Sequence, residues 1–129
     1  MKKVVLLWHH QEPVGICVFA TPSAGLRQRA RYFGTNSNLR GDALAALTSQ
    51  LWVLSRVVLH PTYRGTGVAA AFVRAACKLC PVPWVEALAV MGRANPFVEK
   101  AGFVRVGVTR KQGWGLEPVY YVLDNRQKK

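Results

Sequence analysis

Two apolar runs interrupted by a polar turn occupy the first part of this 129-residue chain, in a pattern typical of β-structure. The segments "KVVLLWHH" (3–10) and "GICVFA" (15–20) are rich in β-branched and aromatic residues and flank the turn sequence "QEPVG". They therefore predict an antiparallel hairpin, in which His9 and His10 would point to opposite faces of their strand. Later, "LWVLSRVVLH" (51–60) predicts a buried strand, which Pro61 ends because proline cannot donate to a β-ladder.

Helix and strand patterns alternate in the second half of the chain. Val68, Phe72, Ala75 and Leu79 recur at helical spacing and predict a helix over residues 68–80. After this helix we expect strands at 84–90, 103–108 and 119–124 and a short helix at 95–102, which Gly102 ends. Two helices and several strands around one core predict a mixed α/β fold (α+β, mixed sheet).

The segment from 21 to 50 lacks a clear period and is interpreted as a basic insertion. Only "DALAALTSQ" (42–50) reads as a short helix. The segment carries four arginines, Arg27, Arg29, Arg31 and Arg40. Together with Lys2, Lys3 and the basic tail "RQKK" (126–129) they could form a surface that follows the phosphates of a nucleic acid, or simply a solvated basic face.

Charge and length narrow the class of protein. The chain has 18 Lys plus Arg against 6 Asp plus Glu, a formal net charge of +12, which favours polyanionic partners. Its length and its 50% hydrophobic content suit a single domain, 1–129. The apolar run in "MKKVVLLW" is too short for a signal peptide or a membrane span, and three cysteines indicate a reducing compartment. We therefore expect a cytoplasmic protein with no membrane partner.

One stretch, "HPTYRGTGVAAAFVRAAC" (60–77), runs from a strand through a glycine turn into a helix. The first N–H groups of a helix lack carbonyl partners and attract anions, Gly65 and Gly67 allow positive φ, and Arg64 adds a charge. The pattern is neither a P-loop nor a dinucleotide fingerprint, because GxxxxGK[ST] and a third glycine are both missing. The residues predict a phosphate site of another kind.

The stretch "VVLHPTYRGTGVA" resembles motif A of the GNAT N-acetyltransferases, whose core reads Q/R-x-x-G-x-G/A. A second block, "NPFVEKAGFVRVG" (95–107), is similar to the asparagine, short helix and "GF" strand entry found later in that family. The resemblance covers residues 51–108. It implies a GNAT-like acyl-CoA N-acyltransferase fold. The segment at 81–103 is similar, more weakly, to GNAT-like domains joined to ABC-type ATPases.

The fold would be shortened at its N-terminus, because the strand and two helices that precede the hairpin in the family have no counterpart here. Those helices form one wall of the acceptor cleft. Three sources of the wall stay open: the arginine-rich segment 25–41, a second subunit, or the rest of a longer protein.

The resemblance implies an acetyl-CoA-dependent N-acetyltransferase in which an amine attacks the thioester directly, with no metal. The pantetheine would pair with the backbone of Val57, Val58 and Leu59, and Asn95 would hydrogen-bond its arm. The residues that would bind the pyrophosphate through their amides are Arg64, Gly65, Thr66, Gly67, Val68 and Ala69.

The sequence departs from the family at the catalytic positions. Val98 stands where a tyrosine commonly acts as general acid, and Ser55 stands where many members carry a glutamate base. Glu86 is the remaining candidate base, and the alternative is a strand glutamate paired with an arginine. His60, before the proline turn, is the second candidate base.

Two further hypotheses stay open. A catalytically degenerate GNAT-like domain would serve as a basic module that binds nucleic acid or protein. "CKLC" (Cys77 and Cys80) offers a single CxxC, so buried thiols are favoured over a zinc or redox site.

Overall fold

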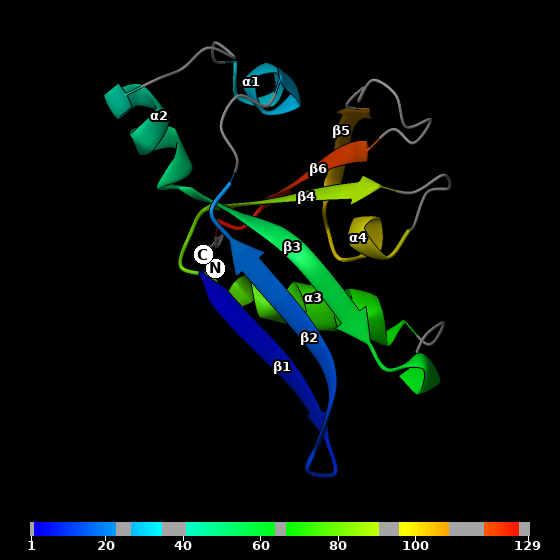
Figure 1. The fold of residues 1–129 in the computed structure, drawn as a ribbon. Helices are drawn as coiled ribbons and strands as arrows, with labels where there is room; N and C mark the ends of the chain where they lie inside the picture. Colours follow the sequence, from blue (N-terminus) through cyan, green and yellow to red (C-terminus); the bar gives the residue numbers. More distant parts are fainter. Residues whose placement is uncertain are drawn as a thin grey trace.

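The computed structural model describes residues 2–22, 27–34, 41–63, 67–90, 96–108 and 118–126. Its strands form one six-stranded sheet in the order β1-β2-β3-β4-β6-β5 (Figure 1). Only the β3–β4 pair is parallel; the other four neighbouring pairs are antiparallel. The strands are β1 (Lys3–His9), β2 (Glu12–Ala20), β3 (Leu51–Leu59), β4 (Trp84–Val90), β5 (Val104–Val108) and β6 (Pro118–Asp124).

Four α-helices accompany the sheet in the described part of the chain, and the expectation of a mixed α/β fold is confirmed. They are α1 (Arg27–Phe33), α2 (Gly41–Thr48), α3 (Val68–Lys78) and α4 (Pro96–Lys100), and a 3₁₀ turn lies at Pro61–Tyr63. Helix α1 was not expected from the sequence, whereas the other three helices lie where their patterns predicted them.

The core lies between α3, α4 and one face of the sheet, which we call the inner face. Alternation along the strands sends every second side chain to this face, as with Cys17 and Phe19 on β2. Phe72 and Val73 of α3 belong to the same buried cluster, together with Val98 of α4. The opposite face of the sheet is the outer face.

The β1–β2 hairpin turn is tighter than expected. The strands are joined by His10 and Gln11, which have φ of 49° and 67°, and β2 already begins at Glu12. The expectation that His9 and His10 point to opposite faces is wrong, because β1 ends at His9 and His10 enters the turn in a left-handed conformation. Their ring centroids lie 4.1 Å apart.

The three cysteines are free and buried in the core, as expected. Burial raises the pKa of Cys17 to about 12 and that of Cys80 to about 11, and it raises the pKa of Cys77 as well. A thiol that keeps its proton is a poor nucleophile and a poor metal ligand. No helix among the described residues combines the length and apolar composition needed to cross a bilayer.

Candidate functional site

The parallel strands β3 and β4 stay paired only over their first four residues. The register runs from Leu51 opposite Trp84 to Leu54 opposite Ala87. Both strands continue beyond that point, to Leu59 and Val90, but no further pairing joins them. Figure 1 shows the two strands diverging from this point. The middle of the sheet therefore opens into a wedge.

A β-bulge explains why the strands separate there. On the other side of β3, where it pairs with β2, Val18 lies opposite Arg56 and Phe19 lies opposite Leu54. Ser55 is therefore an extra residue with no residue of β2 opposite it. The Ser55 hydroxyl donates a hydrogen bond of 3.1 Å to the Val18 carbonyl and fixes the bulge. Because a bulge bends its strand and increases the local twist, β3 turns away from β4 directly after Leu54.

The residues expected to pair with pantetheine lie in the diverging part of β3. Val57, Val58 and Leu59 follow the bulge and remain paired with β2 on one side. On the β4 side, pairing among the described residues ends at Leu54. An extended ligand can add to such a strand edge through main-chain hydrogen bonds. This backbone fits a pantetheine arm.

The diverging strand leads to the N-terminus of α3, where Gly67 is the N-cap. Gly67 has φ of 82° and ψ of −5°, and no side chain caps the helix. A Cβ built on Gly67 would meet no atom of the described residues within 4 Å, so this part of the structure leaves the approach to its backbone open. Val68 and Ala69 begin the helix behind it. Backbone amides at the start of a helix suit a pyrophosphate.

The other predicted cofactor residues, Arg64, Gly65, Thr66 and Asn95, lie outside the described residues. Their roles stay predictions.

A pocket of about 360 Å³ lies where β3 and β4 part. Glu86 faces Val53 across the last paired stretch and is the acidic residue of the lining. The lining residues are Ala20, Thr21, Val53, Leu54, Ser55, Glu86 and Leu88. The pocket thus joins the bulge to the candidate base.

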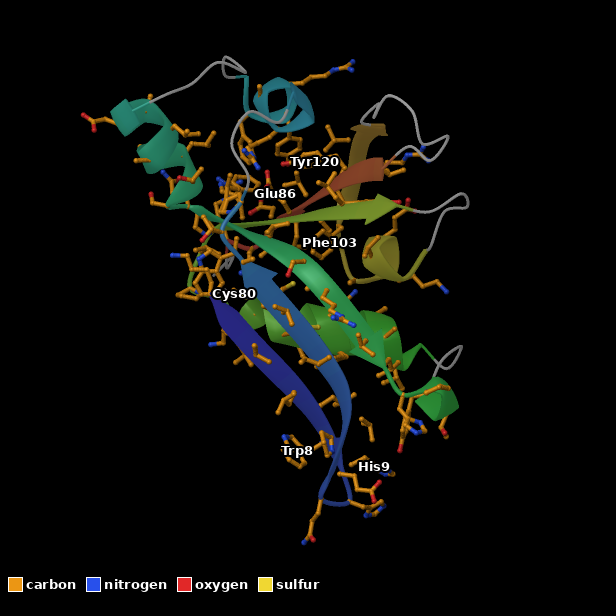
Figure 2. The ribbon with its side chains drawn as sticks, viewed as in Figure 1. Trp8, His9, Cys80, Glu86, Phe103 and Tyr120 are labelled. Atoms are coloured by element: carbon orange, nitrogen blue, oxygen red, sulfur yellow. The ribbon has the colours of Figure 1, made fainter. Side chains whose placement is uncertain are left out.

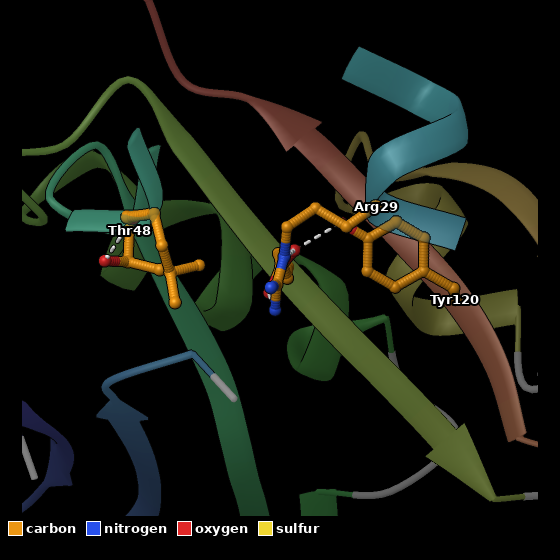
Figure 3. A network of polar contacts seen from close by, with 5 residues as sticks. Arg29, Thr48 and Tyr120 are labelled. Carbon is orange, nitrogen blue, oxygen red and sulfur yellow. Dashed lines mark hydrogen bonds and ion pairs between the residues drawn. The ribbon is translucent and has the colours of Figure 1, made fainter. Parts of the chain in front are cut away.

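Glu86 is held in a buried network with Arg29 of α1 and Tyr120 of β6 (Figure 3). Glu86 Oε2 accepts hydrogen bonds from Arg29 Nε and from the Tyr120 hydroxyl, and Oε1 accepts one from Arg29 Nη2 at 2.8 Å. The three residues are 1%, 2% and 0% exposed in the order Glu86, Arg29, Tyr120. The alternative of a strand glutamate paired with an arginine is therefore what the chain forms.

The network raises the pKa of both hydrogen-bond donors, Arg29 and Tyr120. Burial works against the charge of Arg29, but the hydrogen bond and charge of Glu86 outweigh it and raise the pKa of the guanidinium. Burial, followed by the negative charge of Glu86, raises the pKa of the Tyr120 hydroxyl. Both groups therefore stay protonated and keep donating to the carboxylate.

The burial of Arg29 corrects the expected basic surface. Arg29 was expected among the residues of a phosphate-binding face, but its guanidinium is buried and forms an ion pair with Glu86. Lys3 is half-buried and donates to the Leu79 carbonyl at 3.1 Å. Arg31 and Lys2 are exposed. The Arg27 side chain and Arg40 lie outside the described part.

The other catalytic positions offer little chemistry. Val98 is 3% exposed and packs in the core. The exposed His60 is part of the turn after β3: its N–H donates to the Val14 carbonyl at 2.7 Å and its Nδ1 accepts from the Thr62 N–H at 3.2 Å. Among the described residues, no three His, Cys, Asp or Glu side chains gather to hold a metal ion.

No family model and no curated protein matches the chain. Solved structures do match. An acetyltransferase of the GNAT family from Bacillus cereus ATCC 10987 aligns with a TM-score of 0.65 and 13% identity, over 96% of this chain and 71% of its own. An N-acetyltransferase from Staphylococcus aureus Mu50 aligns with a TM-score of 0.63 and 13% identity, over 95% and 67%.

AAC(6')-Ib in complex with ribostamycin and coenzyme A aligns with a TM-score of 0.63 and 20% identity, over 94% of this chain and 63% of its own. Another structure of that protein holds acetyl-CoA. The fold is therefore the GNAT acyl-CoA N-acyltransferase fold. The chain spans about two thirds of the length of these proteins. The weaker resemblance to domains joined to ABC-type ATPases has no support among them.

Two members of the buried network escaped the sequence reasoning. Arg29 was one of several arginines in a segment without periodicity, and Tyr120 was one of two adjacent tyrosines on a strand. The charge composition carried one signal for this network. A buried glutamate such as Glu86 needs a cation as its partner, and the chain has 18 basic residues for 6 acidic ones.

Proposed function

We propose that the protein is an acetyl-CoA-dependent N-acetyltransferase, which passes an acetyl group to an amine by direct attack in a ternary complex. The observation that carries this proposal is the parting of β3 and β4 at the Ser55 bulge, with the Gly67 cap of α3 at the far end of the wedge. A strand edge and a helix start in series suit a ligand with an extended amide arm and a pyrophosphate.

Acetyl-CoA supplies an activated thioester when it is bound. The backbone of Val57, Val58 and Leu59 would hold the pantetheine arm and aim the carbonyl, and an N–H near Leu59 would stabilise the developing oxyanion. The amide groups of the predicted set from Arg64 to Ala69 would bind the pyrophosphate, and Asn95 would bind the pantetheine arm. Catalysis would thus rest mainly on positioning.

The amine would attack the thioester carbonyl, so that an N–C bond forms, the C–S bond breaks and the thiolate leaves. We assign removal of the amine proton to Glu86, although its carboxylate is paired with Arg29, because Glu86 is the acidic residue of the pocket at the parting of the strands. Arg29 and Tyr120 fix the orientation of that carboxylate. The ribostamycin bound to AAC(6')-Ib favours an amine as the acceptor.

The absence of a tyrosine at Val98 predicts slow turnover. A missing general acid lowers a rate by roughly 10² to 10⁴, although a thiol with a reference pKa near 8.5 also departs as thiolate. We therefore expect cofactor binding of ordinary strength with weak acetyl transfer.

Thermal denaturation with and without acetyl-CoA or CoA tests the binding. A ligand at about 100 times its Kd stabilises the folded state by about 2.7 kcal/mol, so a clear rise in Tm is expected. Gly67→Trp should abolish the rise, because the new side chain fills the open space before α3.

Gly34→Trp is the matched control for this variant. Gly34 also has a positive φ, 68°, and also has no atom within 4 Å of a built Cβ. Both variants carry the same backbone strain, but only Gly67→Trp should lose the ligand. A wild-type Tm that millimolar acetyl-CoA leaves unchanged would overturn the proposal.

Release of CoA from acetyl-CoA in the presence of amines tests the transfer. Glu86→Gln should lower kcat and leave the KM for acetyl-CoA nearly unchanged, whereas a purely structural Glu86 would change only the Tm. The binding-module hypothesis predicts RNA or DNA affinity that falls with salt and that CoA does not alter.

A further inference from the structure

A side-chain contact joins the β1–β2 hairpin to the 3₁₀ turn that follows β3. The Tyr63 hydroxyl and Nδ1 of His9 share a hydrogen bond, and the two rings meet edge to face with their centroids 5.6 Å apart. The two residues are 54 positions apart in the chain. Figure 2 shows His9 on the side of the hairpin tip that faces this turn, and Trp8 on the other side.

The backbone of the hairpin supports the same contact. The β1–β2 register shifts between Leu7 and Trp8, so that Val14 has no residue of β1 opposite it. The Val14 carbonyl accepts a hydrogen bond of 2.7 Å from the N–H of His60, the residue that follows β3. Because a bulge bends its strand and re-aims the groups next to it, this irregularity turns the hairpin end toward the segment between β3 and α3.

The tip of the hairpin adopts a conformation that residues with side chains rarely take. His10 and Gln11 have φ of 49° and 67°, in the left-handed region that favours glycine. The His10 ring lies 4.1 Å from the His9 ring, and the His60 ring lies 6.2 Å from that of Tyr63. The three histidines of the chain thus gather around one tyrosine. Backbone of this kind is often found at functional sites.

Tyr63 is the last described residue before the Gly67 cap of α3. Its N–H donates to the His60 carbonyl at 2.9 Å, so the turn is held to the hairpin at His60 and again at Tyr63. Only residues 64–66 separate Tyr63 from Gly67, and we call residues 64–67 the pyrophosphate loop. Four Cα–Cα steps span at most about 14 Å, so the position of Tyr63 limits the paths that this loop can take.

We propose that His9 and Tyr63 are positioning residues for the cofactor, because their hydrogen bond fixes the start of the pyrophosphate loop. The β1–β2 hairpin is then part of the cofactor site, although neither side chain needs to touch the ligand. This inference rests on the proposed function. Backbone that is held in place before the ligand arrives loses less conformational freedom on binding, which strengthens the affinity.

Calorimetric titration with CoA tests the inference. Tyr63→Phe removes the hydroxyl and keeps the ring, and His9→Leu removes the acceptor. Each should raise the Kd for CoA by about 2- to 10-fold, as expected for the loss of one hydrogen bond. Because the two residues act as a pair, the double variant should bind CoA about as well as either single variant.

Two further variants serve as controls. Tyr32→Phe removes the hydroxyl of a tyrosine on α1 that is 38% exposed, and it should leave the Kd for CoA unchanged. His9→Asn keeps an acceptor close to the position of Nδ1 and should recover most of the affinity lost in His9→Leu. Circular dichroism checks that every variant is folded.

Pantetheine separates an effect on the pyrophosphate loop from a general loss of structure. It lacks the pyrophosphate and would use only the contacts predicted on β3, which depend on the pairing of that strand with β2. Its Kd, measured by NMR titration, should therefore be the same in the wild type, Tyr63→Phe and His9→Leu. A purely structural hydrogen bond would weaken the binding of pantetheine and of CoA by the same factor.

That equal weakening would overturn the inference. It is also overturned if the wild type binds CoA and both Tyr63→Phe and His9→Leu bind it equally well, or if the two effects simply add in the double variant. A wild type that binds no CoA overturns the proposed function, and this inference with it.

Discussion

The two halves of the sheet share one buried inner face but differ on the outer face. On the β4–β6–β5 half, α1 crosses the strands, and its Phe33 and Tyr32 rings pack against Trp84 with centroids 5.1 and 6.0 Å apart. Arg29 of the same helix bonds to Glu86. On the β1–β2–β3 half, no described helix lies on the outer face, where apolar side chains are exposed.

The difference shows that the exposure of a side chain on this sheet depends on whether a helix covers it, and not on whether the side chain is charged or apolar. Glu86 is a charged residue that is 1% exposed, and Trp8 is an aromatic residue that is 57% exposed. The covered half contains a carboxylate that helix α1 holds in place, and the uncovered half exposes apolar side chains. The wedge between β3 and β4 separates the two halves.

Loss of the cation on the covered half should have the largest effect. Arg29→Met should destabilise the protein by about 3–5 kcal/mol in urea denaturation, because it leaves the Glu86 carboxylate buried without its cation. Arg31→Met, on the exposed side of the same helix, is the control and should cost less than about 0.5 kcal/mol.

The double variant Arg29→Met with Glu86→Leu tests the coupling. It should be more stable than Arg29→Met alone, since no unpaired charge remains. If the losses in unfolding free energy of Arg29→Met and Glu86→Leu simply add in the double variant, the Arg29–Glu86 ion pair does not hold α1 in place.

The two faces of β1 should respond differently to the same deletion. Leu7 packs on the core, so Leu7→Ala should cost about 2 kcal/mol, while Leu6→Ala, on the outer face, should cost less than about 0.5 kcal/mol. Urea denaturation of the two variants measures both losses. Equal losses would mean that the outer face of β1 is covered in the folded protein.

The buried thiols under the uncovered half should give a smaller effect that depends on pH. Burial raises the pKa of Cys17 from 9.0 to about 12, so the folded state holds a proton that the unfolded state releases. The free energy of unfolding should therefore fall as pH rises from about 9 to about 12, by up to about 1.4 kcal/mol per pH unit from this thiol.

Cys17→Ala should reduce that slope, and denaturation curves across the pH range measure it. A slope identical to that of the wild type would mean that Cys17 ionises in the folded protein.

Much of the fold was predictable because strong periodicity lies in β3, α3, β4 and β6. The strand expected at 84–90 agrees with β4 at both ends, and the helix expected at 68–80 ends two residues early, at Lys78. Helix α1 was missed because its sequence "RQRARYF" puts three arginines in seven residues, one of which is buried. Local composition indicates a solvated segment there, and contacts with the distant residues Glu86 and Trp84 make it a packed helix.

The sequence by itself determined the sheet, the glycine cap at Gly67 and the likeness to the GNAT fold, because these depend on local patterns of apolar residues, prolines and glycines. Only the tertiary structure decided the rest. The bulge at Ser55 depends on register with β2, and the environment of Glu86 depends on Arg29, 57 residues away in the chain. The exposure of Trp8 depends on which helix covers which half. Strand register, the buried ion pair and the packing of a helix on the sheet all join residues far apart in the sequence, so local sequence patterns cannot predict them.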